Sequence, residues 1–129
     1  QIIDFGVDEI VIADTIGQAN PMEVKLLFSN LLSMNQSDVF SAHFHDTKAL
    51  GLANVFASLD QGIKKFDSSI GGLGGCPFAP GSSGNLATED LVSMLEMMNI
   101  TTGVDLDSLI HSRDLASRIT ALNLTGRII

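Results

Sequence analysis

Two histidines, in the stretch His43-Phe44-His45, are the side chains best able to do chemistry in this sequence. They close an apolar run, residues 39–45, that is typical of a buried strand. Alternate side chains of a strand point to the same face, so both imidazoles would lie together, with Phe44 on the opposite face. Two convergent imidazoles at a strand end form a natural pair of metal ligands. Two polar residues beside a surface loop are the alternative, and the pattern alone does not choose.

Three residues after these histidines each allow a structural and a functional interpretation. Asp46 can orient a histidine or a ligand water, or it can cap the helix that follows. Asn85 can offer its amide oxygen to a metal, or it can shape the end of a loop. Glu89 stands in the first turn of an expected helix, where a negative charge favours the helix dipole, so its first interpretation is structural.

The stretch from Gly71 to Asn85 is the most unusual part of the sequence. It holds six glycines and two prolines in 15 residues, which excludes a helix or a strand. A loop this long is usually functional, and its glycines allow hinge motion and close approach to a ligand. It lacks the Gly-Lys-Ser/Thr ending of a phosphate-binding P-loop, and a flexible linker is the plainer alternative. Its Cys76 can act as a nucleophile or as a donor and acceptor of protons.

The remaining sequence alternates short apolar stretches with longer stretches of helical spacing. Strands are expected at residues 9–13, 39–45 and 65–69. Helices are expected from Pro21 past Leu32, at about 48–61, from about Thr88 to Met98, and from 105 to about 122.

This alternation predicts one α/β domain, residues 1–129, with parallel strands covered by helices. A doubly wound sheet and a (β/α)₈ barrel share the pattern, but three strands cannot close a barrel, which takes about 250 residues. In both architectures the working residues gather at the carboxyl ends of the strands. Asp14, His45 and Ser69 stand at such ends.

Composition excludes several classes of protein. The formal net charge of −8 leaves no basic patch for nucleic acid, and no apolar run approaches the ~18 residues of a membrane span. The single cysteine cannot form an intrachain disulfide. The chain begins Gln-Ile-Ile-Asp-Phe-Gly without a Met, as if at the end of a helix, which we interpret as a piece of a longer protein.

From about Gly6 to Leu106 the chain resembles hydroxymethylglutaryl-CoA lyases. The motifs that carry the resemblance are Asp14-Thr15-Ile16-Gly17, His43-Phe44-His45-Asp46-Thr47, Asp67-Ser68-Ser69 and the loop Gly72-Leu73-Gly74-Gly75-Cys76-Pro77-Phe78-Ala79-Pro80-Gly81, which continues through Ser83-Gly84-Asn85-Leu86-Ala87-Thr88-Glu89-Asp90. Related metal-dependent aldolases and acyl-CoA condensing enzymes share the His-x-His and a later Gly-Asn. They lack the Gly-Gly-Cys-Pro segment.

The resemblance implies a (β/α)₈ TIM barrel of which these are the last three strands. It implies a divalent cation, Mg²⁺ or Mn²⁺, bound by His43, His45 and Asn85, with a further aspartate from the first strand. The implied substrate is 3-hydroxy-3-methylglutaryl-CoA, an acyl-CoA, and the implied products are acetyl-CoA and acetoacetate.

The resemblance also implies roles for other side chains. Cys76 would be the catalytic thiol, which gives a proton to the leaving acetyl-CoA enolate, and His43 would lie near the substrate hydroxyl. Asp14 and Thr15 would contact the substrate. Asp46 and Glu89 would orient the metal ligands without binding the cation themselves.

Departures from the family limit what this chain can do by itself. Lys48-Ala49-Leu50 replaces the usual Tyr-Gly-Gln, and the first five strands, with their Arg-Asp pair, are absent. Mg²⁺ and Mn²⁺ prefer anionic oxygens, so we expect weak cation binding and an inactive isolated chain.

Two alternatives remain open on the sequence. In the first, the parent protein would be a 2-oxo-acid aldolase or an acyl-CoA condensing synthase. In the second, the chain would be a non-catalytic module that self-associates through open sheet edges. A homo-oligomer is expected, and the bacterial cytoplasm or the mitochondrial matrix would suit the parent.

Overall fold

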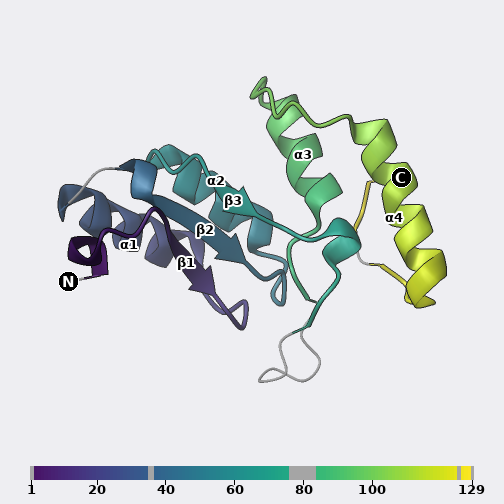
Figure 1. The fold of residues 1–129 in the computed structure, drawn as a ribbon, viewed down its shortest axis with the longest axis horizontal. Helices are drawn as coiled ribbons and strands as arrows, with labels where there is room; N and C mark the ends of the chain where they lie inside the picture. Colours follow the sequence, from purple (N-terminus) through teal and green to yellow (C-terminus); the bar gives the residue numbers. More distant parts are fainter. Residues whose placement is uncertain (1, 35–36, 76–83, 125, 129) are drawn as a thin grey trace.

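The computed structural model describes residues 2–34, 37–75, 84–124 and 126–128 (Figure 1). Its strands are Ile10–Asp14 (β1), Phe40–Phe44 (β2) and Phe66–Asp67 (β3). Its α-helices are Pro21–Met34 (α1), Gly51–Asp60 (α2), Thr88–Met97 (α3) and Leu106–Thr120 (α4). Short 3-10 turns cover Ile2–Phe5 (η1), Ser37–Val39 (η2) and Ile70–Gly72 (η3). The expected alternation of strands and helices is confirmed.

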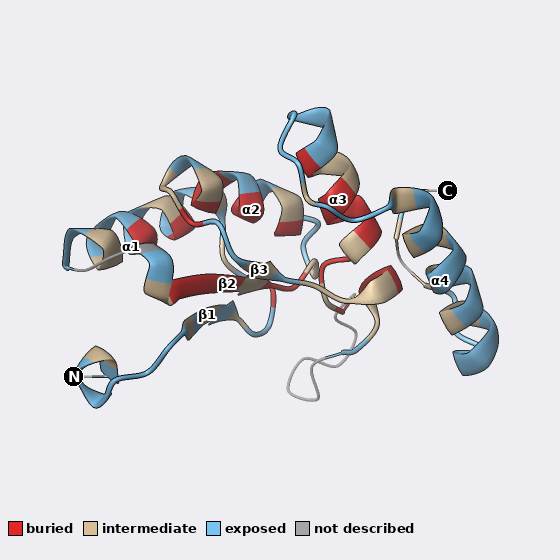
Figure 2. Ribbon diagram, turned by 45° about the horizontal axis from the view of Figure 1, so that its top comes forward, coloured by how far each residue is buried: buried red, intermediate tan, exposed pale blue. Residues whose placement is uncertain are grey.

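The strands form one open sheet in the order β1-β2-β3, and both pairings are parallel. Helices α1 and α2 lie on one face of this sheet, and no described helix covers the other face (Figures 1 and 2). Helices α3 and α4 stand beyond the carboxyl ends of the strands. Three parallel strands with covering helices fit a segment of a (β/α)₈ barrel, as expected.

The core lies between the sheet and its two helices. Alternate residues of the central strand, Phe40, Ala42 and Phe44, point toward the helices and are buried. Phe28 of α1 and Val55 of α2 pack against them. Burial is concentrated on β2 and α2, and it extends to Leu91, Val92 and Leu95 of α3 (Figure 2).

The first strand is only partly buried. Its burial alternates, and Val11, on the face away from the helices, is 50% exposed. Among the described residues, β1 is an edge strand, so only one of its faces is covered.

The second helix begins later than predicted. Lys48 lies in a turn, and Ala49 has φ 57°, a left-handed conformation that a helix cannot contain. The helix starts at Gly51, whose backbone N–H donates to Asp46 Oδ1 at 2.9 Å. The third strand is also shorter than predicted, because Ser69 leaves it to form an isolated bridge with Ala87.

The last helix packs loosely. Asp105 caps it by accepting a hydrogen bond from the Ser108 N–H at 3.0 Å. None of its residues is buried, and its apolar side chains Leu115 and Ile119 remain exposed. No described helix has the length and apolarity that a membrane crossing requires.

A capping box fixes the start of α1. Asn20 Oδ1 accepts from the N–H groups of Met22 and Glu23, at 3.0 and 3.2 Å. In return, Glu23 Oε2 accepts from the Asn20 N–H at 3.0 Å. These bonds satisfy donors that an α-helix leaves free at its first turn.

Asn20→Ala should lower the free energy of unfolding by about 1 kcal/mol, because it leaves those N–H groups without their side-chain acceptor. Urea unfolding monitored by circular dichroism measures the change. Asn30→Ala, at an exposed position inside the same helix, is the control and should leave the stability nearly unchanged. Equal effects of the two substitutions would contradict the role of the cap.

Candidate functional site

The site is built where the chain re-enters the end of the central strand. Residue 85 pairs with His45 in an isolated antiparallel bridge directly after β2. The Asp46 N–H donates to the Gly84 carbonyl at 3.1 Å, and the Leu86 N–H donates to the Phe44 carbonyl at 3.1 Å. The segment 84–87 is thus hydrogen-bonded to the end of β2, which brings Asn85 beside the histidines, as the predicted ligand set requires.

The two imidazoles lie on one face of the sheet, the face that no described helix covers. The ring centroids of His43 and His45 are 5.1 Å apart, with an angle of 62° between the ring planes. Strand alternation therefore orients them as predicted, with Phe44 buried in the core on the other side.

Sequence reasoning did not single out Asp67 as a site residue, although it belongs to the quoted Asp-Ser-Ser motif. Parallel pairing of β2 with β3 places Asp67 directly beside His43. Its Oδ1 is in close contact with Nδ1 of the His43 ring. An acidic residue at the end of a neighbouring strand was the available signal, but only the register shows which histidine it meets.

His45 is the more buried of the two histidines, with 7% of its surface exposed. Burial lowers the pKa of its imidazole, and the nearby His43 lowers that pKa further. Asp14 and Asp67 act in the opposite direction without reversing the shift. Its Nδ1 is buried and has no hydrogen-bond partner among the described residues, so the neutral ring keeps an unused nitrogen here.

Asn85 is held so that its amide oxygen is free. Its Nδ2 donates to the Leu73 carbonyl at 2.7 Å, and its backbone N–H donates to the Gly74 carbonyl at 3.1 Å. Within the described part of the chain, Oδ1 makes no hydrogen bond. The loop-shaping interpretation of Asn85 is confirmed, and the same geometry keeps one neutral oxygen available.

These observations fit a divalent cation held by neutral groups. The unused nitrogen of His45, the imidazole of His43 and the free oxygen of Asn85 are donor types that divalent metals accept. Among the described residues, no three His, Cys, Asp or Glu side chains form a group that could hold a metal. The donor set is therefore short of the anionic oxygens that Mg²⁺ and Mn²⁺ prefer.

Asp14 ends β1 and folds the loop that follows. Its Oδ1 accepts from the Gln18 N–H at 3.0 Å and its Oδ2 from the Ala19 N–H at 3.1 Å. Thr15 is exposed beside it. The carboxylate is thus held in place by backbone groups, and the expected contact of Asp14 and Thr15 with a substrate stays a prediction.

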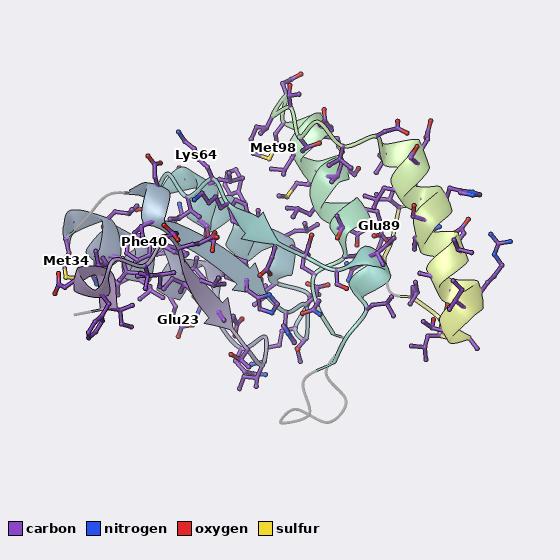
Figure 3. The ribbon with its side chains drawn as sticks, in the orientation of Figure 1. Glu23, Met34, Phe40, Lys64, Glu89 and Met98 are labelled. Atoms are coloured by element: carbon purple, nitrogen blue, oxygen red, sulfur yellow. The ribbon has the colours of Figure 1, made fainter. Side chains whose placement is uncertain are left out.

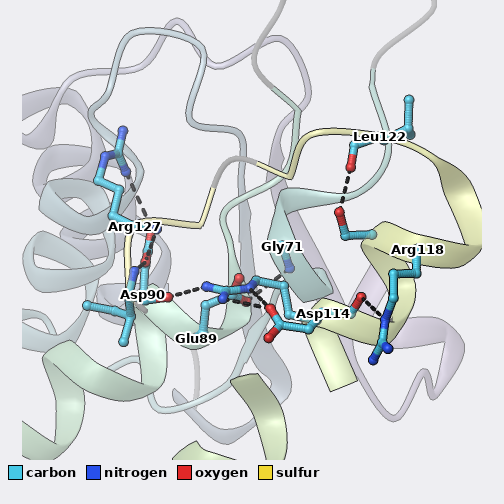
Figure 4. Close-up of polar contacts among 10 residues, drawn as sticks. Gly71, Glu89, Asp90, Asp114, Arg118, Leu122 and Arg127 are labelled. Carbon is cyan, nitrogen blue, oxygen red and sulfur yellow. Dashed lines mark hydrogen bonds and ion pairs between the residues drawn. The ribbon is translucent and has the colours of Figure 1, made fainter. Parts of the chain in front are cut away.

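Asp46 and Glu89 each bond to backbone near the site rather than to a histidine. Asp46 accepts from the Gly51 N–H at the start of α2, although the N-cap position itself is held by Leu50, and it also accepts from Arg127 Nη2 at 3.0 Å. Glu89, where α3 meets η3 (Figure 3), is fully buried and accepts from the Gly71 N–H at 2.9 Å (Figure 4). Both hold the loops around the site, and their support of metal ligands stays a prediction.

Arg127 is a further residue that sequence reasoning missed. Its guanidinium contacts Asp46 and also Asp90 Oδ2, the latter at 3.4 Å, and its backbone N–H donates to Asp90 Oδ1 at 2.7 Å (Figure 4). The Asp46 carboxylate, more than Asp90, raises the pKa of this guanidinium. Nothing in the local sequence signals a contact between residues 46 and 127, so only the fold reveals it.

Cys76, the expected catalytic thiol, lies outside the described residues. The described parts of its loop, residues 71–75 and 84–85, meet through the Gly74 carbonyl and the Asn85 N–H. The two ends of the loop are therefore joined at the carboxyl end of β2.

Comparison with known proteins decides the family. The family model described as HMGL-like matches residues 1–116. The chain belongs to the HMGL-like family.

Several members of the HMGL-like family are close to this chain. It is 50% identical over 111 residues to the hydroxymethylglutaryl-CoA lyase YngG of Bacillus subtilis, which covers 86% of this chain and 37% of the relative. An HMG-CoA lyase structure from Bacillus subtilis superposes with TM-score 0.94 at 45% identity, over 98% of this chain and 42% of the other. The (R)-citramalyl-CoA lyase of Chloroflexus aurantiacus is 43% identical over 112 residues, 87% of this chain and 35% of the relative.

A structure of an HMG-CoA lyase from Acinetobacter baumannii in complex with coenzyme A and 3-methylmalate is also similar. It matches with TM-score 0.91 at 44% identity, over 97% of this chain and 41% of the other. The chain thus spans little more than a third of the curated relatives, and about two fifths of the solved structures, that it matches.

Gly17→Ala should lower the free energy of unfolding, because the loop after β1 packs closely against Thr47 of the His-Asp-Thr segment. A Cβ at Gly17, which has φ +65°, would lie 2.5 Å from Thr47 Oγ1. Gly62, with φ +96° and no atom within 4 Å of an added Cβ, is the matched control for backbone strain alone. Thermal and urea unfolding should show that Gly17→Ala costs about 1–3 kcal/mol more than Gly62→Ala. Equal losses of unfolding free energy in the two variants would mean that the loop after β1 shifts to accommodate the added methyl group.

The lowered pKa of His45 predicts a loss of stability in acid. The unfolded histidine takes up its proton near pH 6.5, whereas the folded one resists protonation until a lower pH. The stabilising contribution is therefore present above about pH 6.5 and is lost as the pH falls from there toward the lowered pKa. Unfolding free energies measured in chelator from about pH 8 to pH 5 should show this fall.

His45→Gln should remove that part of the pH dependence, and His111→Gln, at an exposed position of α4, should leave it intact. The same pH profile in the His45→Gln variant as in the unsubstituted chain would contradict the assignment.

Proposed function

We propose that this chain is the carboxyl-terminal segment of a hydroxymethylglutaryl-CoA lyase, which cleaves 3-hydroxy-3-methylglutaryl-CoA to acetyl-CoA and acetoacetate. The observation that carries the proposal is the meeting of His43, His45 and Asn85 at the end of β2, in a chain that is 50% identical to a hydroxymethylglutaryl-CoA lyase. The acyl-CoA class of substrate is supported by the related lyase structure that contains coenzyme A.

The residue types suit the reaction. A bound divalent cation would polarise oxygen atoms of the substrate as a Lewis acid. When its Nε2 is not bound to the cation, His43 would take the proton of the tertiary hydroxyl, so that the carbon–carbon bond breaks, the oxygen becomes the ketone of acetoacetate and the bonding electrons pass to the acetyl-CoA enolate. Cys76 would give the enolate its proton.

We further propose that the cation is Mg²⁺ or Mn²⁺ and that His43, His45 and Asn85 are only part of its ligand set. Three neutral donors hold these cations weakly, since both prefer anionic oxygens. An aspartate from the first strand of a complete barrel would supply that charge. The isolated 129-residue chain should then bind the cation weakly and lack activity.

A second substrate is supported by one specific relative. The (R)-citramalyl-CoA lyase matches this chain at 43% identity, close to the hydroxymethylglutaryl-CoA lyases, so both acyl-CoA thioesters belong in the assay.

Self-association of the chain is a further proposal. It is supported by the open edge of β1 and by the exposed apolar residues of α4. For the complete enzyme we propose the bacterial cytoplasm or the mitochondrial matrix.

The test uses a hybrid barrel, in which residues 1–129 replace the matching segment of the Bacillus subtilis lyase. The structural match over 98% of this chain makes the exchange feasible. With Mn²⁺ and hydroxymethylglutaryl-CoA, the hybrid barrel should release acetoacetate in a coupled assay. Cys76→Ala should reduce kcat by about 10²- to 10⁴-fold, the usual contribution of a general acid.

The isolated chain should be inactive in the same assay. A hybrid barrel that folds but cleaves neither acyl-CoA would exclude the lyase proposal and favour a 2-oxo-acid aldolase or an acyl-CoA condensing synthase. Preferential cleavage of citramalyl-CoA would correct the substrate while keeping the reaction type.

A further inference from the structure

Asp67 lies beside the His43 imidazole on the open face of the sheet. Parallel register pairs His43 with Asp67 on β3 and with Ala13 on β1. Of these two cross-strand partners of His43, Ala13 has only a methyl group, so Asp67 is the polar one. The contact joins Oδ1 of the carboxylate to Nδ1 of the ring.

We propose that Asp67 is a positioning residue of this site, which accepts the Nδ1–H of His43 and leaves Nε2 as the nitrogen that takes a cation or a proton. A carboxylate can only accept a hydrogen bond, so the proton of a neutral ring in this contact must be on Nδ1. The inference rests on the proposed lyase function and adds a residue to its site. Histidines that bind metals usually donate their other N–H to such a partner, which fixes the tautomer and the ring orientation.

The two histidines are then oriented in different ways. His43 is about a quarter exposed and is held by a side chain from the next strand. His45 is buried, and its Nδ1 has no hydrogen-bond partner among the described residues, so packing and the bridge with Asn85 hold it instead. Loss of the Asp67 carboxylate should therefore change His43 and spare His45, which a general loss of structure would not do.

Nitrogen-15 NMR of the imidazoles in the 129-residue chain tests the tautomer directly. In chelator, and with the His43 ring in its neutral form, the ring should be in the Nδ1–H form. Asp67→Ala should shift it toward the Nε2–H form that free histidine favours, without moving the His45 signals. Asp67→Asn keeps the shape and one acceptor oxygen and should give an intermediate result.

Ser41→Ala is the matched control. Ser41 lies two residues before His43 on the same face of β2, and its Oγ has no described partner. Its replacement should leave the His43 tautomer unchanged. Circular dichroism of every variant confirms that the fold is retained. Asp67 itself is 59% exposed at its side chain, so its truncation leaves no cavity.

Cation affinity in the hybrid barrel is the second measurement. Titration with Mn²⁺, followed by the electron paramagnetic resonance of the free ion, should show about 10- to 100-fold weaker binding in Asp67→Ala and a smaller loss in Asp67→Asn. Ser41→Ala should bind Mn²⁺ like the unsubstituted hybrid.

Three results would overturn the proposal: an Nε2–H tautomer of His43 in the unsubstituted chain, an unchanged tautomer in Asp67→Ala, or a changed tautomer with unchanged Mn²⁺ affinity. Weaker Mn²⁺ binding without a tautomer change would identify Asp67 as a cation ligand instead. If both readouts respond as expected while the hybrid barrel cleaves no acyl-CoA, the positioning role stands and the lyase proposal fails.

Discussion

Parallel pairing of β2 with a strand on each side is the constraint on which the rest of the molecule depends. The strand is only five residues long, yet its two faces have different tasks. One face supplies Phe40, Ala42 and Phe44 to the core under α1 and α2. The other presents His43, followed by His45 just beyond the strand. A shift of one residue in register would exchange the two faces, exposing the phenylalanines and burying the histidines. Stability of the core and presentation of the site are therefore set by the same hydrogen bonds.

The chain also uses backbone pairing to assemble the site from distant segments. Residues 84–87 return from the glycine-rich loop and bond to the ends of β2 and β3 before α3 begins. This return places Asn85 next to His45 and directs its amide nitrogen to the Leu73 carbonyl. Gly84 has φ +91°, and a Cβ there would lie 2.6 Å from the Gly72 carbonyl oxygen, so only glycine allows the two sides of the loop to approach this closely.

Charge around the site is balanced locally in a chain whose formal net charge is −8. Arg127 lies between the carboxylates of Asp46 and Asp90 and holds residues near the chain's end against the segment that follows β2. Asp46 in turn fixes the start of α2 through the Gly51 N–H. These contacts around the histidines thus come from three separate parts of the sequence, residues 46–51, Asp90 and Arg127, none of which could form the site alone.

The sequence by itself determined the elements and the chemical character of the site. Apolar runs and capping residues such as Asn20 and Glu23 act over a few residues, so strand–helix alternation and the capping box could be predicted, as could the shared face of His43 and His45. Local patterns could not show that Ala49 adopts a left-handed turn that delays α2, because that conformation depends on the loop around Asp46. Nor could they show that one face of β1 stays open. Only the tertiary structure decided that Asp67 meets His43 and that Arg127 reaches Asp46, because both contacts depend on strand register and on chain return over 24 and 81 residues.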